Sequence, residues 1–93
     1  MTNYTTVVES LEALRKQWSR SLQYGVLVAD LDPEPTEGES VTVTVLCSWA
    51  EIEVQLQGEI MEAAGAHAVV ELGPFTASTL RAFSKAGLEE VLE

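Results

Sequence analysis

The chain has 93 residues, of which 46% are hydrophobic, and it carries a formal net charge of −10 at pH 7. This length allows one domain, residues 1–93, and the negative charge opposes binding to nucleic acid or to an anionic membrane surface. The single cysteine excludes an intrachain disulfide, so we expect a reducing, cytoplasmic location. Residues 1–6 lack a signal-peptide pattern, and no apolar stretch reaches the roughly 18 residues that span a membrane.

The positive charges are confined to the two ends of the chain. Residues 21–80 contain no lysine or arginine but ten carboxylates, whereas an average domain would place roughly seven basic residues in a segment of this length. Residues 24–73 hold all ten of these carboxylates, and the flanking segments are close to neutral. A field of one sign attracts charges of the opposite sign, so the sequence indicates partners with a basic surface.

The first predicted element is a helix over residues 6–22. Thr6 and Glu9 fit a capping box, in which each side chain satisfies a backbone N–H group of the first turn. Apolar residues then recur every three or four positions, as on one face of a helix: Val7, Leu11, Leu14, Trp18 and Leu22.

Two β-strands joined by an acidic loop are expected next. Residues 24–31 are rich in valine and leucine, and residues 41–47 alternate apolar and polar side chains. Between them, residues 32–40 contain two prolines, one glycine and four acids, which predicts a loop. Consecutive strands joined by a polar loop are expected to pair antiparallel.

Residues 49–64 fit two patterns. Apolar residues first alternate with glutamate and glutamine, which is typical of a strand. Ser48 and Glu51 fit a second capping box, however, and Gly65 stands where a helix often ends. We therefore favour a helix, although Gly58 inside it would cost up to about 1 kcal/mol. The helical stripe would consist of Trp49, Ile52, Leu56, Ile60 and Ala63.

The last predicted elements are a strand over residues 67–72 and a helix from Thr76 to Ala86. Gly87 would end this helix, and residues 88–93 would add one further turn. The predicted fold is therefore α+β, with the order α-β-β-α-β-α and a three-stranded mixed sheet packed by helices. The crossover through the second helix would be right-handed and parallel. So small a sheet leaves an edge strand open, which allows a homodimer.

The acidic loop is the most biased segment of the chain. Asp30 and Asp32 have the alternate spacing of a calcium-binding loop, but that motif requires glycine at its sixth position and glutamate at its twelfth. This chain has Pro35 and Val41 there, so we predict no metal site. The loop is either a solvated segment that keeps the chain soluble or a mobile acidic arm that docks on a basic surface.

The segment from 49 to 64 would add carboxylates on a rigid element. Glu51, Gln55, Glu59 and Glu62 are spaced four, four and three residues apart, so a helix would place them on one face. Such a row can imitate the regular charge of a nucleic-acid backbone. The alternative is the ordinary solvated outer face of an amphipathic helix.

No catalytic constellation is recognisable in the sequence. Cys47 falls on the apolar face of a predicted strand, so it is expected to be a small buried hydrophobe. His67 is the only histidine, and nothing places it beside Cys47. One cysteine and one histidine are also too few for the usual zinc site. Trp18 and Trp49 lie on apolar stripes and are expected in the core. We predict a protein that is not an enzyme and that holds no cofactor or metal.

The leading hypothesis is a small acidic binding or inhibitor protein. Its partner would be a basic protein, a nuclease or a nucleic-acid-binding protein, as for phage anti-defence inhibitors and bacterial immunity proteins, and charge complementarity would raise the association rate. The alternative is a structural or assembly subunit of a phage or bacterial complex, whose acids serve solubility. An acidic, salt-adapted proteome would explain the charge without any partner. The predicted partner-binding residues are Asp30, Asp32, Glu34, Glu37, Glu39, Glu51, Glu59 and Glu62.

Overall fold

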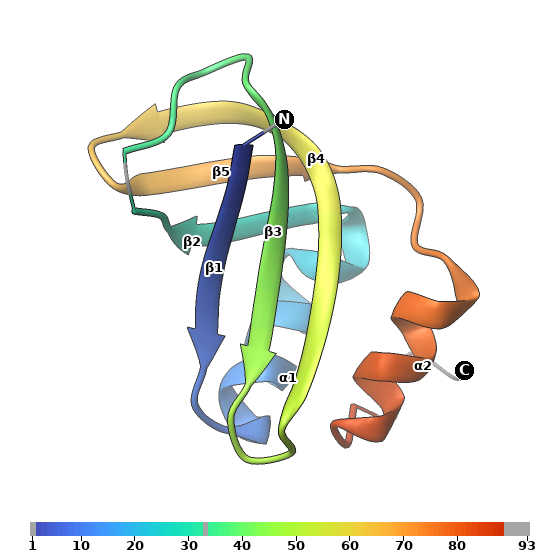
Figure 1. Ribbon diagram of the computed structural model, residues 1–93. Helices are drawn as coiled ribbons and strands as arrows, with labels where there is room; N and C mark the ends of the chain where they lie inside the picture. Colours follow the sequence, from blue (N-terminus) through green and yellow to red (C-terminus); the bar gives the residue numbers. More distant parts are fainter. Residues whose placement is uncertain (1, 33, 89–93) are drawn as a thin grey trace.

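A five-stranded mixed sheet dominates the part of the chain that the structure, a computed structural model, describes: residues 2–32 and 34–88. The strand order is β1-β3-β4-β5-β2; β1 and β3 run parallel, and the other neighbours are antiparallel (Figure 1). The elements in chain order are β1 (Thr2–Val8), α1 (Leu11–Arg20), the 3-10 helix η1 (Leu22–Tyr24), β2 (Val26–Asp30), β3 (Ser40–Cys47), β4 (Ile52–Ala64), β5 (His67–Leu72) and α2 (Ala77–Lys85).

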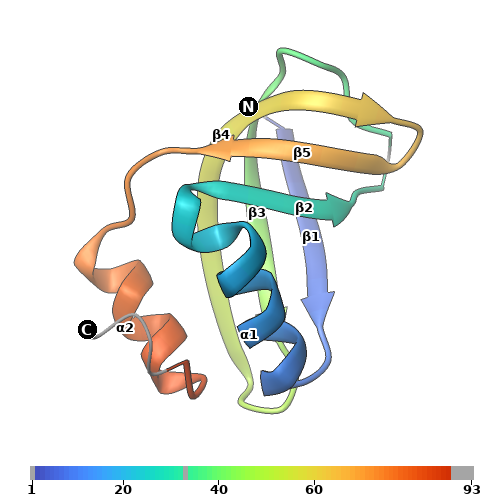
Figure 2. The ribbon, with the colours of Figure 1, turned by 180° about the vertical axis from the view of Figure 1, so that it is seen from behind.

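The sheet curves into a half-barrel with helices on its concave side. The first half of β4 pairs with β3, and its second half, which we call the far half, pairs with β5. As a result, β5 and β2 cross the direction of β1 and β3 (Figure 1). Helix α1 packs on the concave side, and α2 lies beside β4 (Figure 2). The core between them includes Leu14 and Phe83 from the helices and Val43, Val45 and Val70 from the sheet, each at most 1% exposed. The convex face of the sheet carries the alternate, mostly polar side chains.

Gly58 explains where β4 can bend. This residue pairs with Val41 on β3 and also with Leu72 on β5, so two strands approach it from opposite sides. A Cβ atom at this position would lie 2.3 Å from the backbone oxygen of Glu71. Only glycine admits so close an approach. A register shift between Ile60 and Glu62 then adds a β-bulge, which increases the local bend and twist.

The predicted helix over residues 6–22 is wrong in its first part. Residues Thr2–Val8 form strand β1, in which Tyr4 and Val8 are buried while Asn3 and Thr5 are exposed. The helix begins after Ser10, whose Oγ accepts the Ala13 N–H at 3.1 Å, and not after Thr6. A run of β-branched residues with alternating burial favours a strand, and pairing with β3 supplies the hydrogen bonds.

The predicted helix over residues 49–64 is also wrong, because this segment forms the turn after β3 and then β4. The alternation of apolar residues with glutamate and glutamine was the correct signal, since Val54, Leu56 and Ile60 are buried while Gln55 and Gln57 are exposed. The apparent capping box at Ser48 lies in the turn. The pattern of period two prevailed because β3 and β5 offer a pairing partner on each side of β4.

The predicted α-β-β-α-β-α order and three-stranded sheet are therefore replaced by β-α-β-β-β-β-α and five strands. The strands predicted over residues 24–31 and 41–47 do not pair with each other, because β2 pairs with β5 at the edge of the sheet. The parallel pair is β1 with β3. The strands predicted over residues 24–31, 41–47 and 67–72 are confirmed, as is the last helix with Thr76 as its N-cap. The further turn predicted over residues 88–93 falls mostly on residues 89–93, outside the described residues.

Neither helix reaches the length of a membrane span: in the described ranges, α1 has ten residues and α2 has nine.

Candidate functional site

Positive and negative charges occupy different layers of the fold. All five lysine and arginine residues lie on the two helices: Arg15, Lys16 and Arg20 on α1, and Arg81 and Lys85 on α2. The ten carboxylates of residues 21–80 all lie on the sheet or in its loops. The helices cover the concave side of the sheet (Figure 2). The sheet and its loops therefore form a negatively charged layer, and the helices form a mainly positively charged layer beside it.

The acidic loop and the far half of β4 lie together at one end of the sheet (Figure 1). The Gly38 N–H donates to the Ile60 oxygen at 2.8 Å, and the Ile60 N–H donates to the Glu39 oxygen at 2.9 Å, so the end of the loop runs beside β4. The Leu31 N–H donates to the Ala66 oxygen at 2.8 Å, which ties the start of the loop to the β4–β5 turn. We call this region the acidic end; its carboxylates are Asp30, Asp32, Glu34, Glu37, Glu39, Glu59, Glu62 and Glu71.

Glu39 has a structural contact as well as a place at the acidic end. Its Oε1 accepts a 2.7 Å hydrogen bond from the Tyr4 hydroxyl, and Glu39 is half-buried. This hydrogen bond, followed by burial and by the charge of the carboxylate, raises the pKa of Tyr4. The contact joins β1 to the last turn of the acidic loop and fixes the orientation of the carboxylate.

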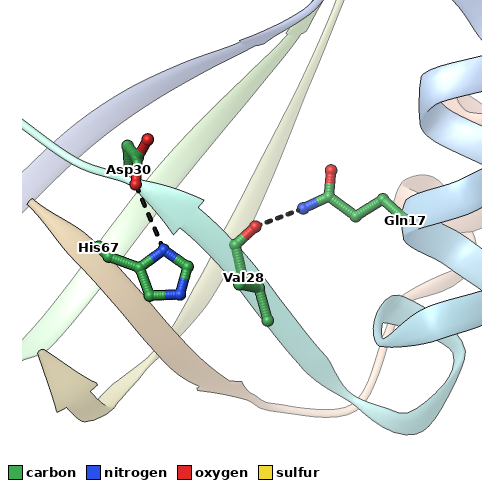
Figure 3. A network of polar contacts seen from close by, with 4 residues as sticks. All are labelled: Gln17, Val28, Asp30 and His67. Atoms are coloured by element: carbon green, nitrogen blue, oxygen red, sulfur yellow. Dashed lines mark hydrogen bonds and ion pairs between the residues drawn. The ribbon is translucent and has the colours of Figure 1, made fainter. Parts of the chain in front are cut away.

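Asp30 is partnered by the only histidine of the chain. Its Oδ1 lies 3.3 Å from His67 Nδ1, across the register pair that joins the end of β2 to the start of β5 (Figure 3). Both side chains are largely exposed, at 81% and 58%. His67, the first residue of β5, therefore has a polar partner in Asp30.

Glu71 belongs to the acidic end but was missed by the sequence argument. It lies directly across from Glu59 in the β4–β5 register, and both are exposed. Like charges directly opposite each other on neighbouring strands are destabilising. The polar positions of the 67–72 strand place Glu71 on the face shared with His67, but only the pairing with β4 reveals its proximity to Glu59.

Glu51 does not join the other predicted site residues. It lies in the β3–β4 turn, at the opposite end of β4 from Glu62, and has a positive φ of 53°. The predicted helical row of Glu51, Gln55, Glu59 and Glu62 does not exist, since β4 is a strand. On its exposed face, Gln55 and Gln57 separate Glu53 from Glu59, so the acids are interrupted rather than regularly spaced.

Cys47 and His67 are not brought together. Cys47 ends β3 and pairs with Ile52, whereas His67 pairs with Ala64 at the other end of β4. Cys47 is 1% exposed, as predicted for a small buried hydrophobe, and burial raises the pKa of its thiol. Among residues 2–32 and 34–88, no three His, Cys, Asp or Glu side chains are placed to hold a metal ion.

The two tryptophans anchor α2 to the rest of the fold. Trp18 stacks on Phe75 with ring centroids 5.9 Å apart and contacts Phe83 at 6.2 Å. Trp49 Nε1 donates a 2.8 Å hydrogen bond to the Ala86 oxygen at the end of α2. Both indoles are half-buried against the core, which agrees with their predicted place there.

No known protein-family model, curated protein or solved structure matches this chain.

Proposed function

We propose that the protein is a small acidic binding or inhibitor protein that engages a basic surface on a protein partner with its acidic end. One observation carries the proposal: carboxylates from a loop and three strands converge at one end of the sheet, while every lysine and arginine lies on the helices. Such a separation of charge orients an approaching basic partner toward one end of the molecule. The partner class is a basic nuclease or nucleic-acid-binding protein, as for immunity proteins and phage anti-defence inhibitors.

The carboxylates at the acidic end have different roles in this proposal. Glu39 and Asp30 already contact Tyr4 and His67. The exposed carboxylates without these contacts are the first to meet the partner: Asp32, Glu34, Glu37, Glu59, Glu62 and Glu71. Because they are exposed, they contribute mainly to association rate and orientation, and a few desolvated apolar contacts must set the affinity.

Met61 supplies an apolar side chain at the same end. It lies at the β-bulge of β4, next to Glu62, and is 48% exposed. An exposed, flexible and polarizable methionine adapts to an apolar spot on a partner and loses water on contact. We therefore assign Met61 as the apolar anchor of the proposed interface, with the carboxylates around it as the polar rim.

The test compares two variants of equal net charge in affinity capture from a lysate of the source organism. The acidic-end variant carries Asp32→Asn, Glu34→Gln, Glu37→Gln and Glu62→Gln. The control variant carries Glu9→Gln, Glu12→Gln, Glu51→Gln and Glu53→Gln. We expect the wild type and the control to retain the same basic protein at about 50 mM salt and to release it at about 500 mM, since screening shortens several-fold over that range. The acidic-end variant should retain much less of this basic protein at the lower salt concentration. Equal retention by both variants would contradict the proposal.

A second candidate function is an assembly subunit whose acids serve solubility. The observation that favours it is the outer edge of β1, along which no other strand of the described residues pairs. Under this alternative, contacts survive high salt and do not depend on the acidic end. We place either function in the reducing cytoplasm, because Cys47 is a free, buried thiol.

A further inference from the structure

The two edges of the sheet differ in how their backbone groups are satisfied. At the β2 edge, the Val26 N–H donates to the Ser21 oxygen at 3.2 Å, and Gln17 Nε2 donates to the Val28 oxygen at 2.8 Å. Figure 3 shows Gln17 reaching from α1 to this edge. The helix and its side chain therefore occupy places where another strand would have to bond, and β2 is protected against strand addition.

No described residue protects the β1 edge in this way. The Ser48 N–H donates to the Val8 oxygen, so the backbone groups of Val8 and of every second residue before it point toward β3. Those of Asn3, Thr5 and Val7 consequently point away from the sheet. Within residues 2–32 and 34–88, no hydrogen bond involves these outward groups. Each of the three residues presents a free N–H donor and a free C=O acceptor along an open edge.

The side chains of β1 also lack the usual devices against edge pairing. The strand has seven residues in unbroken register with β3, without a bulge. It contains no lysine, no proline and no charged residue. Natural edge strands are commonly blunted by one of these features. Val7 is 55% exposed, so the edge also presents apolar surface.

We propose that β1 pairs antiparallel with β1 of a second copy of this chain, about a two-fold axis at Thr5. Thr5 would then lie opposite its own copy, and Asn3 opposite Val7. Because these are the residues whose backbone groups point outward, the pairing forms about six hydrogen bonds and joins the two sheets into one. The proposal is independent of the acidic end.

Charge favours a second copy in this orientation. The chain carries a net charge of −10, yet the paired segment is neutral, so no like charges face each other across the strands. The start of β1 lies near the acidic end, as the Tyr4–Glu39 hydrogen bond shows, and Val8 lies near the β3–β4 turn. Antiparallel pairing therefore places the two acidic ends at opposite ends of the dimer, whereas parallel pairing would place them side by side.

The first experiment measures the molecular mass of the full chain by sedimentation over a range of concentrations. We expect a dimer that persists at about 500 mM salt, where screening removes surface electrostatics. Thr5→Pro removes an outward N–H, which an edge strand tolerates, and Thr5→Lys places two positive charges face to face. Each should raise the dimer dissociation constant about tenfold or more. The matched control is Gln55→Lys, in the same cross-strand row but on a central strand, and it should leave the dimer intact.

The second experiment tests the register by oxidation to a disulfide. Thr5→Cys would place two Cα atoms about 5.5 Å apart, which a disulfide can bridge. Asn3→Cys would leave its two copies about 13 Å apart along the strands, so it should not cross-link with itself. A monomer at all concentrations would overturn the proposal, as would a dimer unaffected by both Thr5 substitutions. Self-cross-linking by Asn3→Cys in place of Thr5→Cys would overturn the antiparallel register.

Discussion

The Tyr4 hydroxyl donates a 2.7 Å hydrogen bond to Glu39, a residue 35 positions away, and so joins the edge strand β1 to the end of the acidic loop. This contact connects the open edge of the sheet with the region that we assign to partner binding. It also leaves Glu39 oriented by the fold, in contrast to the exposed carboxylates that precede it in the loop.

Tyr4→Phe should lower the free energy of unfolding, and its effect should depend on pH. The pKa of Tyr4 is raised in the folded state by the Glu39 hydrogen bond, burial and the Glu39 charge. The corresponding stability is present below the pKa of tyrosine in the unfolded chain, about 10, and is lost as pH rises through the folded pKa. Urea unfolding at a series of pH values should show that the difference in free energy of unfolding between wild type and variant becomes smaller above about pH 10.

The control is Tyr24→Phe. Because Tyr24 is 73% exposed, this substitution should leave the free energy of unfolding nearly unchanged at any pH. The assigned hydrogen bond would be contradicted if the difference in free energy of unfolding between wild type and Tyr4→Phe stayed constant from neutral to strongly alkaline pH.

Gly58→Ala should destabilise the fold by about 2–3 kcal/mol, because the new Cβ meets backbone and overpacking at such a site forces shifts of the chain. The nearest atom, the Glu71 backbone oxygen, would be 2.3 Å away. Gly73→Ala is the matched control, since its nearest atom would be 4.0 Å away, and it should change stability by less than about 0.5 kcal/mol. Chemical denaturation measures both; equal effects would disprove the close crossing of β4 and β5.

Cys47 should be inert in the folded protein and should weaken the fold at alkaline pH. Burial raises the pKa of its thiol, so its stabilising contribution is present below the pKa of the unfolded thiol and is lost as pH rises above it. Wild type should therefore lose more stability above about pH 9 than Cys47→Ala does. An aromatic disulfide reagent should react only after addition of urea. Rapid reaction without denaturant would show that Cys47 is not buried.

Local signals in the sequence were sufficient for some elements and insufficient for others. The Thr76 cap and the strand over residues 67–72 depend on nearby residues, and both were predictable. At Thr6 and at residues 49–64, capping boxes and helical spacing competed with alternation. The outcome there was decided by pairing with β3 and β5, which lies outside any local window.

The same limit applies to the acidic end. The loop acids were predictable because they follow one another in sequence. Glu71 was missed because its position opposite Glu59 follows only from the β4–β5 register. Glu51 was grouped with Glu59 because a helix would have placed the two on one face, whereas the strand β4, of thirteen residues, runs from the β3–β4 turn to the acidic end.

The most direct test of the central claim is an amide chemical-shift titration of the ¹⁵N-labelled chain with a lysine-rich peptide of net charge about +6, at about 50 mM salt. The charge layout predicts shifts concentrated at residues 30–39 and around Glu59, Glu62 and Glu71. It also predicts affinity that falls several-fold for the acidic-end variant but stays near wild type for the control variant of equal charge. Shifts spread evenly over the sheet, with both variants weakened equally, would contradict it.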